Sequence, residues 1–238
     1  MSLPCFNKST QPMQIIAHRG ASTQALENSL AAFEIALAQG VDGIEFDVHF
    51  VNGQALVLHD TNLKRTHQLD IPIQTLLPEQ LIDYGILTLK DVLALINGQC
   101  VVNIELKSTD NLHALVNALQ YLCKQGLINS NTVISSFDHE LLDASQQALP
   151  QCQYGGLIAH LPQDLAQYAV SLDFDIVAIA ADVVCEALIV DAHAKGKQVW
   201  VYTVDDPMQA QALARWQVDA IFTNETGLML NQFHISGL

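Results

Sequence analysis

Polar and apolar residues alternate strictly along one stretch near the start of the chain. Glu45, Asp47 and His49 alternate with apolar residues at positions 44, 46, 48 and 50. In an extended strand successive side chains point to opposite faces, so the three polar groups share one face and the apolar groups share the other. The pattern therefore predicts a largely buried strand that carries two acids and a histidine on one side.

A hairpin is predicted to follow this strand. The pair Asn52-Gly53 is typical of a tight two-residue turn. A second apolar run over 55–58 leads directly to His59 and Asp60. The stretch 43–60 is thus expected to bring two acids and two histidines into one neighbourhood, and we interpret it as part of a functional site.

Strand and helix patterns alternate along most of the remaining chain. Such alternation indicates a parallel sheet with helical crossovers, and a chain of 238 residues suits a single (β/α)8 TIM barrel, which typically has about 250. We expect one domain over 1–238. A doubly wound open sheet is the alternative, but no Gly-x-Gly-x-x-Gly turn follows a strand. The predicted strands outside the hairpin span 14–17, 101–106, 132–136, 154–159, 175–180, 198–204 and 219–222. The predicted helices span 27–40, 87–96, 111–125, 139–149, 164–172, 185–194, 208–216 and 227–233, and 61–85 is expected to be a loop with a short helix over 78–83.

Composition allows a large core and makes some partners improbable. Half of the residues are hydrophobic and 15% are charged, with 25 acids against 10 Lys and Arg, so the net charge is −15. Such a surface repels nucleic acid and anionic membranes, and we expect neither as a partner. An anionic small molecule would need local attraction from a metal or from a few basic side chains. The composition does not specify the oligomeric state.

Targeting and redox features predict a cytoplasmic protein. Residues 1–13 hold one Lys, two Pro and no apolar run, so they do not resemble a signal peptide. No stretch approaches the ~20 apolar residues of a membrane span. The five cysteines (5, 100, 123, 152 and 185) fit neither a zinc site nor a disulfide framework, and we expect reduced, mostly buried thiols.

Three carboxylates are candidates for a metal site. Glu45 and Asp47 lie on the alternating strand, and Glu105 lies near the end of the next predicted barrel strand. Hard oxygen ligands suit Mg²⁺ or Ca²⁺. The plainer interpretation of each acid alone is a solvated or ion-paired strand end. Three clustered anions repel one another without a cation, which favours one divalent ion.

Histidines and cations complete the candidate site. His18 and His59 each follow an apolar strand, and as a pair they suit a general acid and a general base, or else metal ligands. Arg19 and Lys107 are scarce positive charges that suit a phosphate clamp, against simple pairing with the acids. The role of His49 stays open. The other histidines show no such company and are treated as background: 67, 113, 139, 160, 193 and 234.

The ordered motifs resemble those of the glycerophosphodiester phosphodiesterase family. The resemblance is strongest in the first half of the chain and covers most of it. It rests on His18-Arg19-Gly20, Glu27-Asn28-Ser29-Leu30-Ala31-Ala32-Phe33, Gly43-Ile44-Glu45-Phe46-Asp47-Val48, His59-Asp60 and Asn103-Ile104-Glu105-Leu106-Lys107, and more weakly on Ser135-Ser136-Phe137 and Tyr202-Thr203-Val204.

The resemblance implies a barrel that hydrolyses glycerophosphodiesters to sn-glycerol 3-phosphate and an alcohol. By this analogy the three carboxylates hold a Mg²⁺ or Ca²⁺ ion, and His18 and His59 are acid and base. Arg19 and Lys107 would bind the phosphate, with Asn28 and Tyr202 also on the substrate.

The chain departs from the family pattern at several places. Leu26 replaces a usual Pro, Tyr202 a Trp, Asp205 an Asn and Asn224 an Asp, and the insertion between His59 and Glu105 is short. Two other functions compete with the proposed hydrolase. One is a phospholipase-type barrel that acts on another phosphodiester, and the other is a silent barrel that only binds a phosphorylated metabolite.

Overall fold

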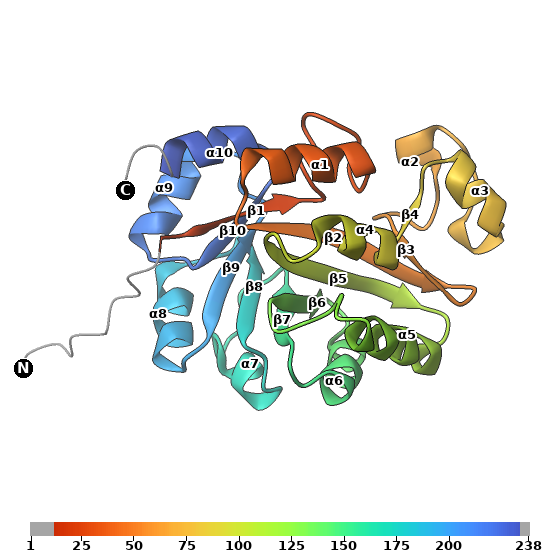
Figure 1. Ribbon diagram of the computed structural model, residues 1–238. Helices are drawn as coiled ribbons and strands as arrows, with labels where there is room; N and C mark the ends of the chain where they lie inside the picture. Colours follow the sequence, from red (N-terminus) through yellow and green to blue (C-terminus); the bar gives the residue numbers. More distant parts are fainter. Residues whose placement is uncertain (1–11, 234–238) are drawn as a thin grey trace, which may run out of the picture.

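The computed structural model describes residues 12–233, which form a closed barrel of eight parallel strands with helices outside it (Figure 1). Pairing of the first strand with the second closes the ring, with His18 level with Glu45. This closure confirms the predicted (β/α)8 barrel and excludes the open sheet. The barrel strands are β1 (Gln14–His18), β2 (Gly43–Val51), β5 (Val101–Thr109), β6 (Thr132–Ser136), β7 (Gln153–Ile158), β8 (Ile176–Ala180), β9 (Gln198–Tyr202) and β10 (Ala220–Thr223).

Helices follow the barrel strands as predicted, with shifted ends. The helix predicted from 27 begins at Leu30, because Asn28 has a positive φ of 57° and Ser29 caps the helix. The helix predicted from 164 begins only at Gln167, because Leu165 has a left-handed backbone. The outer helices are α1 (Leu30–Gln39), α4 (Leu89–Ile96), α5 (Leu112–Lys124), α6 (His139–Ala148), α7 (Gln167–Ser171), α8 (Glu186–Ala194), α9 (Pro207–Arg215) and α10 (Thr226–Phe233).

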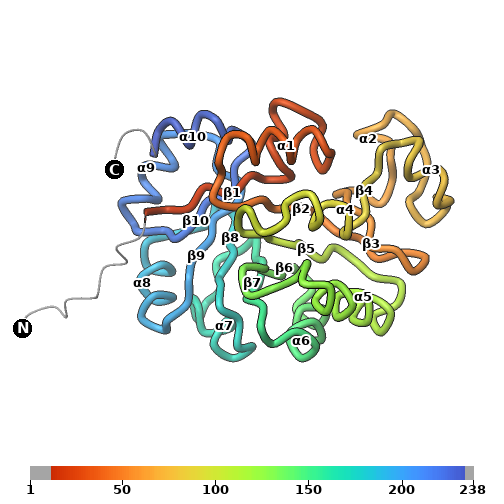
Figure 2. Tube along the Cα trace, in the orientation of Figure 1, coloured from red at the N-terminus to blue at the C-terminus, as the bar shows by residue number. Residues whose placement is uncertain are grey.

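The insertion after the second strand starts with the predicted hairpin. Strand β3 (Gln54–Val57) runs antiparallel to β2, and Asn52 and Gly53 turn between them with φ of 51° and 76°. The expected helix α3 (Pro78–Asp83) is present, whereas α2 (Lys64–His67) and the 3-10 turn η1 (Ile73–Thr75) were not predicted. Residues 87 and 88 form strand β4 (Leu87–Thr88) instead of helix, because the Thr88 side chain accepts from Asp91 N and caps α4. Figure 2 shows the insertion at one side of the barrel, with α2 and α3 beside β3 and β4.

The apolar residues form separate layers inside and outside the barrel. Ile44, Phe46, Val48 and Phe50 of β2 belong to the large cluster between the barrel and its helices. A smaller cluster that includes Trp200 and Phe222 fills the barrel interior. The apolar residues of β2 therefore share one face, as predicted, and the structure turns that face toward the helices.

The four cysteines that the structure describes are free thiols, but the prediction that most are buried is wrong for them. Among the described residues only Cys152 is buried, whereas Cys100, Cys123 and Cys185 are half-buried at the edges of the core. Cys5 and His234 lie outside the described residues. No helix in the described part of the chain is long and apolar enough to cross a membrane.

Candidate active site

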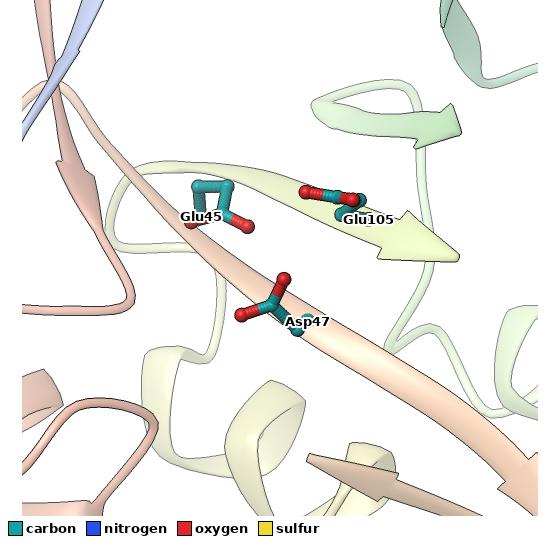
Figure 3. Close-up of side chains that lie close together, drawn as sticks. All are labelled: Glu45, Asp47 and Glu105. Atoms are coloured by element: carbon teal, nitrogen blue, oxygen red, sulfur yellow. The ribbon is translucent and has the colours of Figure 1, made fainter. Parts of the chain in front are cut away.

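Three carboxylates from two neighbouring strands point toward one another at one end of the barrel (Figure 3). Glu45 and Asp47 lie on β2, and Glu105 lies on β5 level with Asp47. One oxygen from each lies within 4.8 Å of the others. The parallel register of β2 and β5 thus brings together the acids that the sequence singled out.

These acids are buried and incompletely paired. Asp47 is 0% exposed, Glu45 3% and Glu105 9%. One oxygen of Glu45 (Oε1) and one of Asp47 (Oδ1) have no hydrogen-bond partner. Burial, and then the charges of Asp47 and Glu105, raise the pKa of Glu45 well above its usual value. Burial and Asp47 also raise the pKa of Glu105. Unpaired buried carboxylate oxygens are costly, and a divalent cation is the partner that such an oxygen set suits.

Two cations flank the cluster. The Arg19 guanidinium pairs with Glu27 (2.9 Å) and Asp47 (3.1 Å), and the Lys107 ammonium lies 2.7 Å from Glu105 and 3.7 Å from Asp47. Burial lowers the pKa of each cation, but the neighbouring carboxylates outweigh this effect and raise it. The ion pairing that the sequence offered as the plainer interpretation is therefore present.

The loop after β1 turns sharply toward the cluster. Arg19 and Gly20 both have positive φ, and the Arg19 backbone N donates to Glu45 Oε2 at 3.0 Å. A Cβ on Gly20 would lie 2.8 Å from the backbone of Ala32 at the start of α1, so only glycine fits there. Close packing of this loop on α1 thus places His18 and Arg19 beside the acids.

Asn28 is directed at the cluster as well. It is 6% exposed, and its Nδ2 donates to Asp47 Oδ2 at 2.9 Å. Its own left-handed backbone makes this reach from the residue before the helix cap possible. Asn28 therefore orients a carboxylate, which is a different contact from the substrate contact that the sequence predicted.

His18 ends β1 beside Glu45. Its Nδ1 lies 2.8 Å from Asn224 Oδ1, and its Nε2 lies 4.0 Å from Glu45 Oε2. Burial, and then the Arg19 charge, lower the pKa of His18. A neutral imidazole at this place is suited to accept a proton.

His59 belongs to a chain of ion pairs that sequence reasoning missed. Its Nδ1 lies 2.7 Å from Asp60 Oδ1, Arg65 Nε donates to Asp60 Oδ2 at 2.7 Å, and Arg65 also donates twice to Glu27 at 2.6 Å. The Arg65 hydrogen bonds dominate in lowering the pKa of Asp60 to about 2. A rare cation in the polar stretch 61–85 was the signal that could have identified Arg65.

His49 has a positioning contact rather than a place in the acidic cluster. Its Nδ1 lies 2.7 Å from Ser108 Oγ, and its Nε2 lies 2.9 Å from the His59 carbonyl oxygen. The ring therefore ties β2 and β5 to the segment that carries His59. These two contacts indicate a positioning role for His49, whose role the sequence left open.

Tyr202 lies at the end of β9, and its hydroxyl is hydrogen-bonded within the barrel. The hydroxyl donates to the Ile158 carbonyl oxygen at 2.7 Å. Its ring meets Phe137 edge to face at 5.9 Å, and Lys107 lies 5.8 Å from the Phe137 ring centre. Phe137 is 49% exposed, so Tyr202 contributes to a partly open aromatic wall beside Lys107.

Comparison with known proteins matches this site to one family. Residues 18–228 match the profile of the Glycerophosphoryl diester phosphodiesterase family. The chain belongs to this family. Its members are phosphoric diester hydrolases, and the resemblance inferred from the motifs is confirmed.

Individual members of the glycerophosphoryl diester phosphodiesterase family agree over nearly the full length. A glycerophosphodiester phosphodiesterase of Caldanaerobacter subterraneus subsp. tengcongensis is 29% identical over 91% of this chain and 96% of its own. The structure of an Oleispira antarctica phosphodiesterase in complex with the product sn-glycerol-3-phosphate is 25% identical, with a TM-score of 0.84 over 93% of this chain and 96% of that one. The glycerophosphodiester phosphodiesterase of Thermotoga maritima is 27% identical, with a TM-score of 0.78 over 93% and 98%.

Proposed function

We propose that this protein hydrolyses glycerophosphodiesters to sn-glycerol 3-phosphate and an alcohol, with one Mg²⁺ or Ca²⁺ ion and two histidines. The observation that carries the proposal is the buried cluster of Glu45, Asp47 and Glu105, in which two oxygens lack a hydrogen bond and Glu45 lies 4.0 Å from His18. The names of the relatives, and the product bound in the Oleispira antarctica structure, support this substrate class.

The carboxylates are proposed to hold the cation. Two of them offer a buried oxygen without a hydrogen bond, which is the donor set that a hard divalent ion prefers. When bound, such an ion supplies Lewis-acid stabilisation of the charge that develops on a phosphodiester. Asn28 keeps Asp47 in place through its amide, which leaves Asp47 Oδ1 directed at the cluster.

Arg19 and Lys107 are proposed to bind phosphate oxygens. Both cations already lie at the cluster, and both are held by acids that would also contact the metal. A phosphodiester resists attack because its negative oxygens repel the nucleophile, and positive side chains at the reacting group lessen that repulsion. The aromatic wall of Tyr202 and Phe137, beside Lys107, offers an apolar face to the rest of the substrate.

The two histidines are proposed to act as base and acid. His18, which burial keeps neutral, removes the proton from the nucleophile. The nucleophile is either water, which gives sn-glycerol 3-phosphate directly, or the glycerol 2-hydroxyl, which gives a cyclic phosphate that water then opens to sn-glycerol 3-phosphate. As the bond between phosphorus and the alcohol oxygen breaks, His59 gives its proton to that oxygen. Asp60 contacts His59 Nδ1 and leaves Nε2 available for this transfer. General acid–base catalysis of this kind is worth about 10²–10⁴ in rate.

The proposal extends to the domain organisation, the partners and the location of the enzyme. A single domain is supported by the continuous barrel, and a small-molecule substrate suits a chain of net charge −15 better than nucleic acid or an anionic membrane. A cytoplasmic location is supported by the free thiols.

The test is release of sn-glycerol 3-phosphate from glycerophosphocholine and glycerophosphoethanolamine. Wild type is assayed in EDTA and then with Mg²⁺ or Ca²⁺ restored, beside His59→Ala and the exposed control His113→Ala on α5. We expect turnover that needs metal, falls about 10²–10⁴-fold in His59→Ala and is unchanged in the control. Turnover in EDTA equal to that with metal, or no product from either substrate, would contradict the proposal.

A further inference from the structure

A short hydrogen-bond chain runs from His18 to the end of β9. Asn224 Oδ1 lies 2.8 Å from His18 Nδ1 and also accepts from Ser22 Oγ at 2.8 Å. On its other side, Asn224 donates through Nδ2 to Asp205 Oδ2 and through its backbone N to Asp205 Oδ1, both at 2.7 Å. Thr223 Oγ1 also donates to Asp205 Oδ1, at 3.1 Å.

This chain has only one consistent set of donors and acceptors. An ionised carboxylate only accepts, so the NH₂ group of Asn224 must face Asp205. The amide oxygen of Asn224 must then face His18, and an amide oxygen cannot donate. His18 Nδ1 therefore carries the hydrogen in the neutral ring, and the lone pair lies on Nε2, the nitrogen that is 4.0 Å from Glu45.

We infer that Asp205 is a positioning residue that acts through the Asn224 amide to hold His18 as the Nδ1–H tautomer. Asp205 is exposed and lies outside the acidic cluster. It does not contact the His18 ring itself, but acts on it through the Asn224 side chain that lies between them. The inference deepens the proposed function and rests on it, because an unprotonated Nε2 is what His18 needs to remove a proton from the nucleophile.

The variant Asp205→Asn disrupts this arrangement of hydrogen-bond donors and acceptors. The introduced amide has one oxygen where the carboxylate had two. If that oxygen keeps the backbone N–H of residue 224 and the Thr223 hydroxyl, its NH₂ group faces the NH₂ group of Asn224. Relief comes from rotation of the Asn224 amide by half a turn, which presents an N–H to His18 Nδ1 and favours the Nε2–H tautomer.

Exchange of the residues at positions 205 and 224 should restore the arrangement of donors and acceptors that holds His18 as the Nδ1–H tautomer. In Asp205→Asn/Asn224→Asp, the carboxylate at 224 again only accepts, from His18 Nδ1 and Ser22. The amide at 205 donates its NH₂ group to that carboxylate, and its oxygen accepts from the backbone N–H of residue 224. The double variant has the same composition and net charge as wild type, so any difference between these two proteins comes from the placement of the two side chains and not from charge.

The first measurement is the tautomer itself. Long-range ¹H–¹⁵N spectra of ¹⁵N-histidine protein, recorded at pH 8 with Mg²⁺, distinguish Nδ1–H from Nε2–H rings, and the His18 signals are those absent from His18→Ala. We expect Nδ1–H in wild type and in the exchanged double variant, and a substantial Nε2–H population in Asp205→Asn. Asp206→Asn is the matched control, because the neighbouring Asp206 only caps α9 through Met208 N.

The second measurement is the rate of glycerophosphocholine hydrolysis. We expect kcat to fall about 10- to 100-fold in Asp205→Asn, part of the full value of acid–base catalysis, and to recover in the exchanged double variant. An Nε2–H ring in wild type, or an unchanged tautomer in Asp205→Asn, would overturn the inference. The spectra need no turnover, so absence of activity in wild type would contradict the proposed function while leaving the tautomer result to stand by itself.

Discussion

Acidic side chains lie at both ends of the barrel, but their surroundings differ. At the N-terminal ends of the strands, three aspartates each precede a strand and accept a backbone N–H from the neighbouring strand. Asp42 accepts from Ile15 N at 2.7 Å, Asp175 from Tyr154 N at 2.8 Å and Asp219 from Val199 N at 2.7 Å. At the C-terminal ends, by contrast, one buried oxygen of Glu45 (Oε1) and one of Asp47 (Oδ1) accept no hydrogen bond.

The difference separates acids that stabilise the fold from acids suited to bind a ligand. A carboxylate that accepts an otherwise unpaired backbone N–H satisfies a group that folding has removed from water. A buried carboxylate without a partner raises the free energy of the folded chain until something positive binds. The two ends of one barrel therefore use the same chemical group for opposite purposes, as is usual in this fold.

The largest expected effect comes from a change in the cluster. Asp47→Asn should lower glycerophosphocholine turnover on the order of 10³-fold, because the charge stabilisation from a metal ion is worth several kcal/mol. The expected cost in folding stability is small, since the amide keeps the shape of the side chain. Assays of sn-glycerol 3-phosphate release and urea unfolding on the same sample check both parts. Loss of stability with retained turnover would reverse the assignment of this end of the barrel.

The opposite outcome is expected at the other end. Asp175→Ala leaves the Tyr154 N–H without its acceptor, and should reduce the free energy of unfolding by about 1–3 kcal/mol. Turnover per folded molecule should stay at the wild-type level, because Asp175 lies at the end of the barrel remote from the cluster. Urea unfolding measures the free energy of unfolding, and an assay of glycerophosphocholine hydrolysis at the same temperature measures the turnover per folded molecule. Asp173→Asn, at an exposed neighbour whose left-handed backbone asparagine also tolerates, controls for loss of charge.

A smaller effect of reversed sign is expected from Glu45→Gln in EDTA. A carboxyl group whose pKa is raised by folding binds its proton more tightly in the folded state, so folding stability falls as the pH rises toward the folded pKa. Removal of that charge should increase the free energy of unfolding by about 1 kcal/mol at pH 8. The gain should vanish when Mg²⁺ or Ca²⁺ is added. A destabilised variant in EDTA would show that Glu45 belongs with the structural acids.

The smallest effect concerns the ion pairs of Arg65. Folding lowers the pKa of Glu27 and of Asp60 to about 2 each. Lowered carboxyl pKa values give stability that is present above the unfolded pKa, 4.5 for Glu27 and 3.8 for Asp60, and is lost as the pH falls toward 2. Arg65→Gln should reduce the acid-sensitive contribution of Glu27 and Asp60 to the free energy of unfolding by less than about 1 kcal/mol, because Arg65 is half exposed. Unfolding at pH 6 and pH 3 measures it, with Lys64→Gln as the control; equal pH dependence in Arg65→Gln and wild type would contradict it.

Sequence patterns predicted the barrel and the contents of the cluster because both depend on local order. Alternation in β2 places Glu45 and Asp47 on one face, and strand ends meet in a parallel barrel, so Glu105 joins them. The helix ends were less predictable, since a single left-handed residue such as Leu165 shortens a helix without a change in its apolar pattern.

Contacts between distant segments could not be predicted. Arg65 reaches Glu27 across 38 residues, and the sequence gives no sign of that pairing. Asp205 and Asn224 were noted as two separate departures from the family pattern, but the Asn224 amide donates to Asp205, a contact that the sequence did not indicate. Asn28 donates to Asp47, a contact that the sequence did not indicate, because its left-handed backbone turns the amide inward, and its contact with substrate stays a prediction.

We propose that the C-terminal cluster, and not the N-terminal aspartates, binds the cation. Calorimetric titration of Mg²⁺ and of Ca²⁺ into wild type, Asp47→Asn and Asp175→Asn distinguishes the two ends of the barrel. We expect one cation per chain in wild type and in Asp175→Asn, and no binding in Asp47→Asn. Equal binding by all three proteins, or loss of binding only in Asp175→Asn, would contradict it.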